Sequence, residues 1–251
     1  MIKRPALLLV LLVLATGAVV ADPSRVHVND ESDARAIEIA QATVAAMGGW
    51  DALDATRYVS WNFFARRQHY WDRHTGDIRI ESVRDGVSTV VLMNIQTGEG
   101  RVFNDGVQLE GEAAAEVLEF GQQAWVNDAY WMFMPYKMLD PGVTLGYVGE
   151  KQTADGMDAW VLDLTFGVGV GYTPENRYHV YVGKDSGLVE QWDFYAEAGN
   201  EEPSFASPWK DWKTFGGIKL ATNHGRGVDW EIAVHATLPA SVLSDPAPVE
   251  P

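Results

Sequence analysis

Apolar and polar residues alternate with a period of two over most of this chain. In residues 56–63, Val59, Trp61 and Phe63 share one face, while polar residues occupy the other. The same alternation recurs in further segments as far as residue 238. Short turn sequences such as NDG, DPG and KDSG separate these segments. The pattern predicts about ten or eleven antiparallel strands joined by hairpins.

Helical spacing replaces this alternation near the N-terminal end, in residues 29–49. Asp30 or Ser32 supplies an N-cap, and acidic residues near the start suit the helix dipole. Gly48 and Gly49 supply a left-handed stop at the other end. We therefore expect one helix here, followed by residues that fold back onto the same core.

A second helical region extends over residues 112–139. Gly121 weakens its middle, and Pro135 interrupts its second half. We expect the region to break into two helices near Asn127 and Asp128, and to end at the DPG turn that follows.

This order of strands and helices predicts a mainly β, α+β fold. We expect a single strongly curved antiparallel sheet, or incomplete β-barrel, whose concave face is covered by the helices. Helices in that position protect the apolar face of the sheet from water. One domain is expected over residues 22–240, and the Pro-rich tail, residues 241–251, is expected to be disordered.

The first residues have the features of a secretory signal peptide. Lys3 and Arg4 form a positive start, an apolar stretch follows, and small residues precede a cleavage position near Ala21. We expect residues 1–21 to be removed, which leaves no transmembrane segment in the mature chain. The protein is then exported and resides in the periplasm or outside the cell.

Charge and cysteine content narrow the classes of function. The chain holds 19 basic and 35 acidic residues, for a net charge of −16. Nucleic acid is not an expected partner, because phosphate binding needs a basic surface. The sequence has no cysteine, which excludes disulfides and thiolate metal sites.

Patterns for catalysis and metal binding are weak. The six histidines form no HExxH or other close ligand pattern, and no G-x-S-x-G sequence is present. We therefore predict no metal site, no cofactor and no catalytic residues. Asp72 with Asp77, or Asp163 with Asp193, can meet across strands. Such carboxylate pairs keep a secreted hydrolase or a carbohydrate binder as a less favoured alternative.

Bulky apolar residues are concentrated in the stretch NDAYWMFMPYKMLDPGVTL, residues 127–145. They either fill an ordinary core or line a space for an apolar ligand. Methionine is flexible, and surfaces that accept varied apolar partners use it heavily. We predict that this stretch and sheet-facing aromatic residues line such a space. The predicted lining residues are Trp61, Phe63, Tyr130, Trp131, Phe133, Met134 and Trp160.

Several segments resemble the LolA/LolB-like superfamily of periplasmic lipoprotein carriers. They are MGGWDAL, WNFFARRQHYWDRHTGDIRIE, YHVYVGKDSGLVEQWDFY and WKDWKTFGGIKLAT. The central aromatic stretch looks nearer to secreted relatives of unassigned function than to LolA itself. The resemblance covers roughly residues 30–240. It implies an incomplete barrel whose apolar cavity, closed by helices, holds acyl chains, and it carries over no catalytic residue.

Pattern and resemblance together predict an exported binding or carrier protein, not an enzyme. Its ligand would be a lipid, a lipoprotein acyl chain or a similar apolar molecule. The second hypothesis is an envelope interaction or sensor module of the same fold, which holds no ligand and binds a protein partner through an exposed apolar patch.

Overall fold

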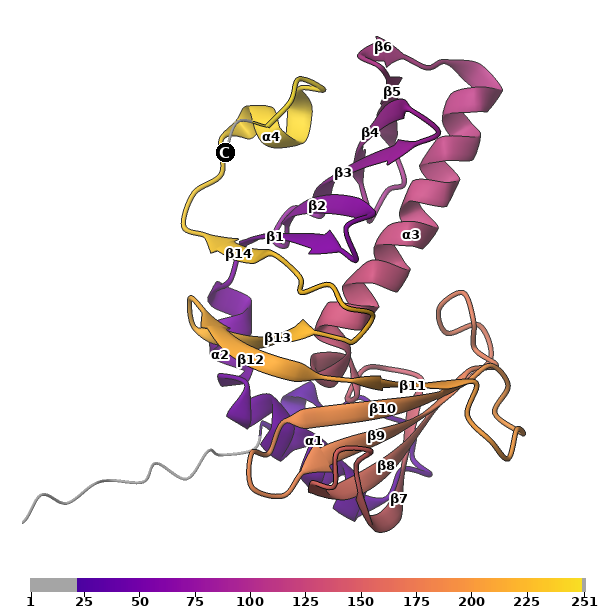
Figure 1. Ribbon diagram of the computed structural model, residues 1–251, viewed down its shortest axis with the longest axis vertical. Coiled ribbons are helices and arrows are strands. Elements are labelled where there is room, and N and C mark those ends of the chain that lie inside the picture. Colours follow the sequence, from indigo (N-terminus) through magenta and orange to yellow (C-terminus); the bar gives the residue numbers. More distant parts are fainter. Residues whose placement is uncertain (1–21, 250–251) are drawn as a thin grey trace, which may run out of the picture.

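The computed structural model describes residues 22–249. The predicted signal peptide, residues 1–21, and its cleavage position near Ala21 lie outside the described residues, as do residues 250 and 251. Antiparallel strands and four α-helices make up the described chain (Figure 1). A short 3-10 turn, η1, precedes them at Pro23–Arg25. The helices are α1 (Ala34–Ala46), α2 (Gly49–Ala55), α3 (Gly111–Lys137) and α4 (Ala240–Ser244).

The strands form three antiparallel sheets, here called sheets A, B and C. Sheet A has the order β14-β1-β2-β3-β4-β5-β6, with β1 (Tyr58–Phe63), β2 (Arg67–Asp72), β3 (Asp77–Arg84), β4 (Val87–Asn94), β5 (Gly100–Asn104), β6 (Val107–Gln108) and β14 (Ile232–His235). Sheet B has the order β11-β10-β9-β8-β7, with β7 (Val143–Gln152), β8 (Asp158–Phe166), β9 (Arg177–Gly183), β10 (Val189–Tyr195) and β11 (Phe205–Pro208). Sheet C pairs β12 (Lys210–Phe215) with β13 (Ile218–Asn223).

The α+β class and the antiparallel pairing are confirmed, but the single curved sheet of ten or eleven strands is wrong. The described strands number fourteen, in sheets of seven, five and two, and no sheet is closed or strongly curled. Alternation of apolar residues identifies a strand, but it does not say which strand is its neighbour. Helix α3 lies between β6 and β7 in the chain, and each of these strands becomes the edge of a different sheet.

Two apolar clusters hold these layers together. The larger one joins α1, the second half of α3, β1 and the inner face of sheet B. The smaller one lies between sheet A and the first half of α3, where Ile78, Ile80 and Val91 pack beside Leu118 and Trp125. Figure 1 shows α3 along one face of sheet A, with α4 on the opposite side of that sheet.

Helix α1 begins later than residue 29, and neither predicted N-cap is used. Asp33 caps the helix instead, because its side chain accepts a hydrogen bond from the backbone N–H of Arg35. The residues before it are engaged with the edge of sheet B. The backbone N–H of Asn29 donates to the carbonyl of Val143, and Ser32 Oγ accepts from the backbone N–H of Leu145.

The expected break of the second helical region near Asn127 and Asp128 is also wrong, since α3 is one helix of 27 residues. Gly121 serves close packing: a Cβ at this position would lie 3.2 Å from Val91 on sheet A. Pro135 comes only two residues before the last residue of α3, Lys137, so little helix remains for it to interrupt.

Part of the tail, which the sequence predicts to be disordered, is bound to sheet A. Arg79 of β3 is only 1% exposed, and its guanidinium donates to the carbonyls of Val242, Asp245 and Ala247 at 3.2, 2.5 and 2.7 Å. A buried guanidinium needs such acceptors. Since the acceptors are backbone atoms, the tail sequence gave no sign of this contact.

The Gly48–Gly49 stop is confirmed, and it provides a stability test. Both residues have positive φ, of 114° and 82°. A Cβ at Gly48 would lie 2.3 Å from the carbonyl oxygen of Gly217, whereas one at Gly49 would meet nothing within 4 Å. Left-handed strain costs alanine about 1–2 kcal/mol at either position. The clash adds a further ~1–3 kcal/mol only in Gly48→Ala.

We therefore expect Gly48→Ala to lose clearly more free energy of unfolding than Gly49→Ala, measured by urea denaturation. Equal losses in the two variants would mean that the contact between α2 and the turn before β13 is not close.

Candidate ligand-binding cleft

A cleft of about 740 Å³ lies between the second half of α3, the inner face of sheet B and the β1–β2 turn. The β8–β9 loop and the loop after β13 complete its border. We call it the aromatic cleft, because nine aromatic residues line it. They are Phe63, Tyr130, Trp131, Phe166, Tyr172, Tyr178, Trp192, Phe194 and Phe205. Its volume falls within the range of small-molecule binding sites.

Helix and sheet contribute opposite walls of the aromatic cleft. On the helix side, Trp131 meets Trp192 of β10 edge to face, with ring centroids 4.6 Å apart. Trp131 also lies parallel to Phe205 at 6.2 Å. On the sheet side, Tyr178 lies 4.9 Å from Trp192 and 5.4 Å from Phe194. These contacts hold the rings in fixed orientations, so the wall is rigid and mostly apolar.

The tyrosines of the wall stay neutral. Burial raises the pKa of Tyr178 to about 12 and raises that of Tyr130 well above its ordinary value. Both phenols therefore keep their protons at any physiological pH. These two phenols therefore add no negative charge to the wall.

A buried ionic cluster fixes α3 beside the aromatic cleft. Arg67 of β2 donates two hydrogen bonds to the carboxylate of Asp128 on α3, at 2.6 and 2.8 Å. The Nε2 of His69 lies 2.8 Å from the same carboxylate. Asp128 and His69 are both fully buried, and the indole of Trp61 stacks on the His69 ring at 4.4 Å.

The pKa values define the charges of this cluster. Burial alone would raise the pKa of Asp128, but the hydrogen bonds from His69 and Arg67 and the charge of Arg67 outweigh it and lower the pKa. Burial is the main cause that lowers the pKa of His69. The cluster therefore holds a carboxylate, a guanidinium and a neutral imidazole that donates from Nε2.

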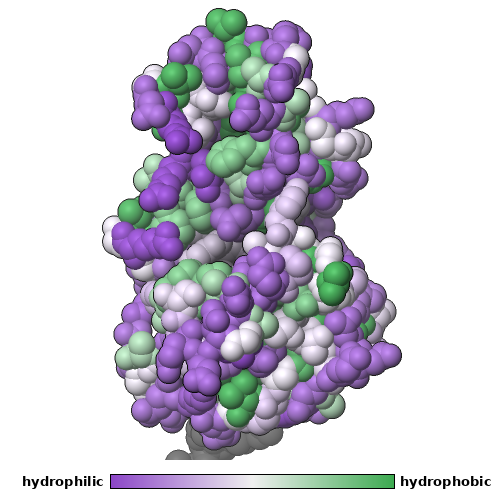
Figure 2. Space-filling view, turned by 90° about the vertical axis from the view of Figure 1, so that its right-hand side faces the viewer, coloured by the Kyte–Doolittle hydropathy of each residue, from purple (hydrophilic) through white to green (hydrophobic). Residues whose placement is uncertain are grey.

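Basic residues dominate the charged lining of the aromatic cleft. Arg66, Arg67, Lys137 and Arg226 border it, against the single carboxylate of Asp140. Arg67 is neutralised by Asp128, and Lys137 by Asp140. The face of the molecule that carries α3 is otherwise mostly hydrophilic, with apolar residues exposed in small separate areas (Figure 2).

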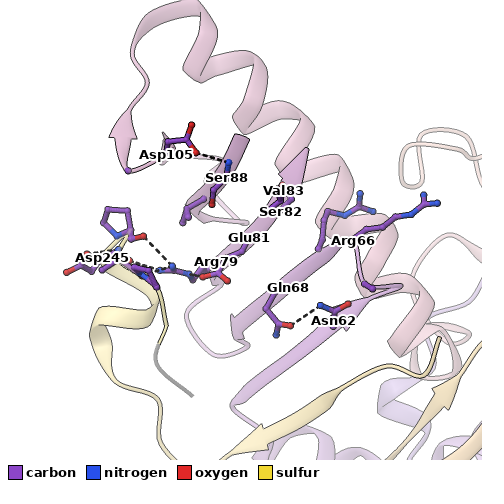
Figure 3. Close-up of a pocket in the computed structure, with 17 residues that line it drawn as sticks. Asn62, Arg66, Gln68, Arg79, Glu81, Ser82, Val83, Ser88, Asp105 and Asp245 are labelled. Carbon is purple, nitrogen blue, oxygen red and sulfur yellow. Dashed lines mark hydrogen bonds and ion pairs between the residues drawn. The ribbon is translucent and has the colours of Figure 1, made fainter. Parts of the chain in front are cut away.

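A second hollow, also of about 740 Å³, lies on the opposite face of sheet A, beside the tail. We call it the polar groove. Arg79, Glu81 and the tail residue Asp245 lie on one side of it, and Arg66 lies on the other (Figure 3). Arg66 and Arg67 line both hollows, so the β1–β2 turn separates the aromatic cleft from the polar groove.

The structure brings three of the seven predicted lining residues, Phe63, Tyr130 and Trp131, together in the aromatic cleft. The other four lie elsewhere. Trp61 is stacked on His69, and Phe133 packs against Trp71.

Met134 is fully buried in the larger core, and so are Met132 and Met138, so these methionines fill space instead of bordering the cleft. Trp160 lies beneath the guanidinium of Arg35, near the end of β8 that is far from the cleft.

Sequence reasoning missed the sheet B side of the lining. Tyr178, Trp192 and Phe194 lie in the segment YHVYVGKDSGLVEQWDFY, which the sequence predicts as strands, but they were not proposed as lining residues. A signal was present, because these residues and the predicted Trp160 occupy the same face of consecutive hairpins. The adjacent Arg66 and Arg67 stand out in the sequence as a possible local basic patch, whereas Arg226 gave no comparable signal.

The two carboxylate pairs considered for hydrolysis have other partners. Asp72 accepts from Arg57, and Asp77 accepts from Thr75 and Asn94. Asp163 and Asp193 lie opposite the same residue, His179, from the strands on either side of it. Asp193 accepts hydrogen bonds from Tyr181 and Gln191. Among residues 22–249, no group of three or more His, Asp or Glu residues is arranged to hold a metal ion. Within the same range, no helix combines the length and apolar character needed to cross a membrane.

No protein-family model matches the chain, and no curated protein does. Among solved structures, it is similar to a DUF1329 family protein from Desulfovibrio piger. That match has 14% identity and a TM-score of 0.44, and it covers 84% of this chain and 97% of the other.

A LolA superfamily protein from Nitrosomonas europaea also matches, with 12% identity, a TM-score of 0.41, and coverage of 83% and 97%. The structural matches thus include the superfamily that the sequence resembles. Likeness at this level says nothing about a ligand or a partner.

The ionic cluster predicts a large loss of stability on Asp128→Ala. Removing this carboxylate leaves Arg67 uncompensated next to a buried helix, which costs about 3–5 kcal/mol. Asp140→Ala serves as the matched control, because the Lys137–Asp140 pair is partly exposed and such pairs contribute about 0–1 kcal/mol. Chemical denaturation measures both losses, and a loss below that of the control would contradict the role given to Asp128.

His224 predicts a pH dependence of stability. Its ring is 1% exposed, lies 4.5 Å from Trp209 and 4.4 Å from Trp230, and burial lowers its pKa to about 3. Below its unfolded pKa of about 6.5, the unfolded chain binds a proton that the folded chain does not. Stability is therefore lost as the pH falls, by about 2 kcal/mol for His224 between pH 7 and pH 5.

His224→Phe is expected to reduce this loss, while His27→Phe, at an exposed position, leaves it as it is. Thermal unfolding at a series of pH values measures the slope for each variant. The same slope in His224→Phe and the unchanged protein would show that this ring does not stay neutral.

Proposed function

We propose that this chain is an exported protein that binds an apolar ligand, such as a lipid or an acyl chain, in the aromatic cleft, and that it acts as a carrier and not as an enzyme. The observation that carries the proposal is the 740 Å³ cleft with nine aromatic residues in its lining. Export rests on the signal peptide that the sequence predicts for residues 1–21.

The energetics of an alkyl chain support this function. Each buried methylene contributes about 0.8 kcal/mol, so burying a chain of about ten methylenes contributes about 8 kcal/mol against the entropy cost of association. The rigid rings of the wall need little reorganisation to accept it.

The entrance of the cleft suits a ligand that enters from solvent. The β8–β9 loop borders it, and glycines at positions 167, 169 and 171 leave its backbone little side-chain bulk. Val168 and Tyr172 in the same loop are strongly exposed. Apolar residues at an entrance are in place to meet an apolar molecule before it is buried.

The alternative, a protein-interaction module, predicts one continuous exposed apolar patch. The most exposed large apolar residues of the described chain are instead dispersed over several elements. They include Val83 on β3, Val107 on β6 and Phe120 on α3. The aromatic cleft therefore supports ligand binding better than the surface supports a protein partner.

A blocking substitution tests the proposal. Val126→Trp places a bulky ring on α3 at the border of the cleft, while Val148→Trp places the same ring on β7, outside it. We expect the unchanged protein and Val148→Trp to bind the neutral apolar probe N-phenyl-1-naphthylamine, and Val126→Trp to bind it at least about tenfold more weakly. Fluorescence titration of protein prepared without detergent measures the affinities. Equal affinity in all three proteins, or no binding to any, would refute this assignment.

A further inference from the structure

The charged residues around the aromatic cleft do not follow the composition of the chain. Acidic residues outnumber basic ones by 35 to 19 in the sequence, yet four of the five charged residues that line the cleft are basic. Two of these four, Arg67 and Lys137, have carboxylate partners. Within residues 22–249, Arg66 and Arg226 form no ion pair. The cleft therefore carries two positive charges that no protein carboxylate balances.

Arg226 is held over the cleft by aromatic rings. Its guanidinium carbon lies 4.9 Å from the ring centroid of Phe64, 5.6 Å from Trp131 and 6.0 Å from Phe205. Cation–π attraction of this kind keeps the guanidinium over the wall of the cleft. Its N–H groups donate no hydrogen bond to a side chain or carbonyl of the described residues, so they stay available to an acceptor on a ligand.

Arg66 is placed by the turn that separates the two hollows. The preceding residues Phe64 and Ala65 both have positive φ, of 49° and 54°, which makes the turn tight. Arg66 is exposed at its end and borders both the aromatic cleft and the polar groove. Figure 3 shows it at the side of the groove away from Asp245, where no tail residue is labelled. A polar group that leaves the aromatic cleft at this point meets Arg66 first.

Based on the proposed function, we infer that the natural ligand is a single-chain amphiphile with an anionic head group, a carboxylate or a phosphate. The apolar chain occupies the aromatic cleft, and Arg66 and Arg226 bind the head group. Guanidinium groups form charge-assisted, bidentate hydrogen bonds with both kinds of anion. The rest of the chain is strongly acidic and repels anions, so the two arginines make the border of the cleft the favoured place for an anionic group.

Three ligands with the same ten-carbon chain test the inference: decanoate, decanol and decyltrimethylammonium, each below its micelle concentration. Competition against the neutral fluorescent probe gives the affinities. We expect decanoate to bind roughly tenfold or more tightly than decanol, and decyltrimethylammonium to bind most weakly. Addition of salt to about 0.5 M is expected to weaken the binding of decanoate, because salt screens its charge, and to leave the binding of decanol unchanged.

Comparing the affinity for decyl phosphate with that for decanoate identifies the preferred head group. Tight binding of either anion supports the inference, and the tighter of the two names the natural class. Arg66→Gln and Arg226→Gln are expected to bring the affinity for the preferred anion toward that for decanol, with no change for decanol itself. Arg84→Gln is the control, because Arg84 is exposed at the end of β3 and borders neither hollow.

Two failures are distinguishable. If no ligand of the series displaces the probe and the probe itself does not bind, the proposed function is wrong. If decanol and decanoate bind with the same affinity, or if the arginine variants bind both as the unchanged protein does, apolar binding stands and the anionic head group is wrong. Tightest binding of decyltrimethylammonium would also overturn the inference.

Discussion

The buried contact of Arg67 and His69 with Asp128 determines where α3 lies, and the cleft depends on that position. Asp128 sits in the second half of a helix of 27 residues, and its partners come from β2, the neighbour of the strand that carries Phe63. Tyr130 and Trp131 follow within one turn of the helix. A buried carboxylate with four hydrogen bonds, from Arg67, His69 and the neighbouring Asn127, tolerates little displacement, because any shift leaves a charge without a partner. The aromatic wall on the helix side is therefore set by a polar contact behind it.

Aromatic rings and guanidinium groups cooperate at the border of the cleft. The rings supply apolar area, and their faces also attract the cation of Arg226, which then lies along the wall instead of extending into water. A surface of this kind combines an apolar interior with a charged opening, although the chain as a whole is strongly acidic.

The period-two pattern of the sequence identified strands and their apolar faces, but it could not predict contacts between segments that lie far apart in the chain. The hairpin of β9 and β10, with its KDSG turn, was predicted, and Trp160 does lie on the apolar face of β8, together with Leu162 and Leu164. Alternation shows which face of a strand a residue occupies, but not where along the strand a cleft lies. Trp160 was therefore expected to line a space that lies nearer the other end of β8. The pairing of Arg67 with Asp128 joins residues 61 positions apart, and no local pattern encodes it. The same holds for the tail, which binds Arg79 through backbone carbonyls.

The pairing of β1 with β14 has a consequence for how the molecule forms. Ser60 and His235, which are hydrogen-bonded across these strands, are separated by 175 positions in the chain. Contacts of such high sequence separation form slowly, because the intervening loop must close before they contribute. Until then, β1 presents unpaired backbone groups that can template association between molecules. This edge is therefore protected against aggregation only after β14, Ile232–His235, has been made and has paired with β1.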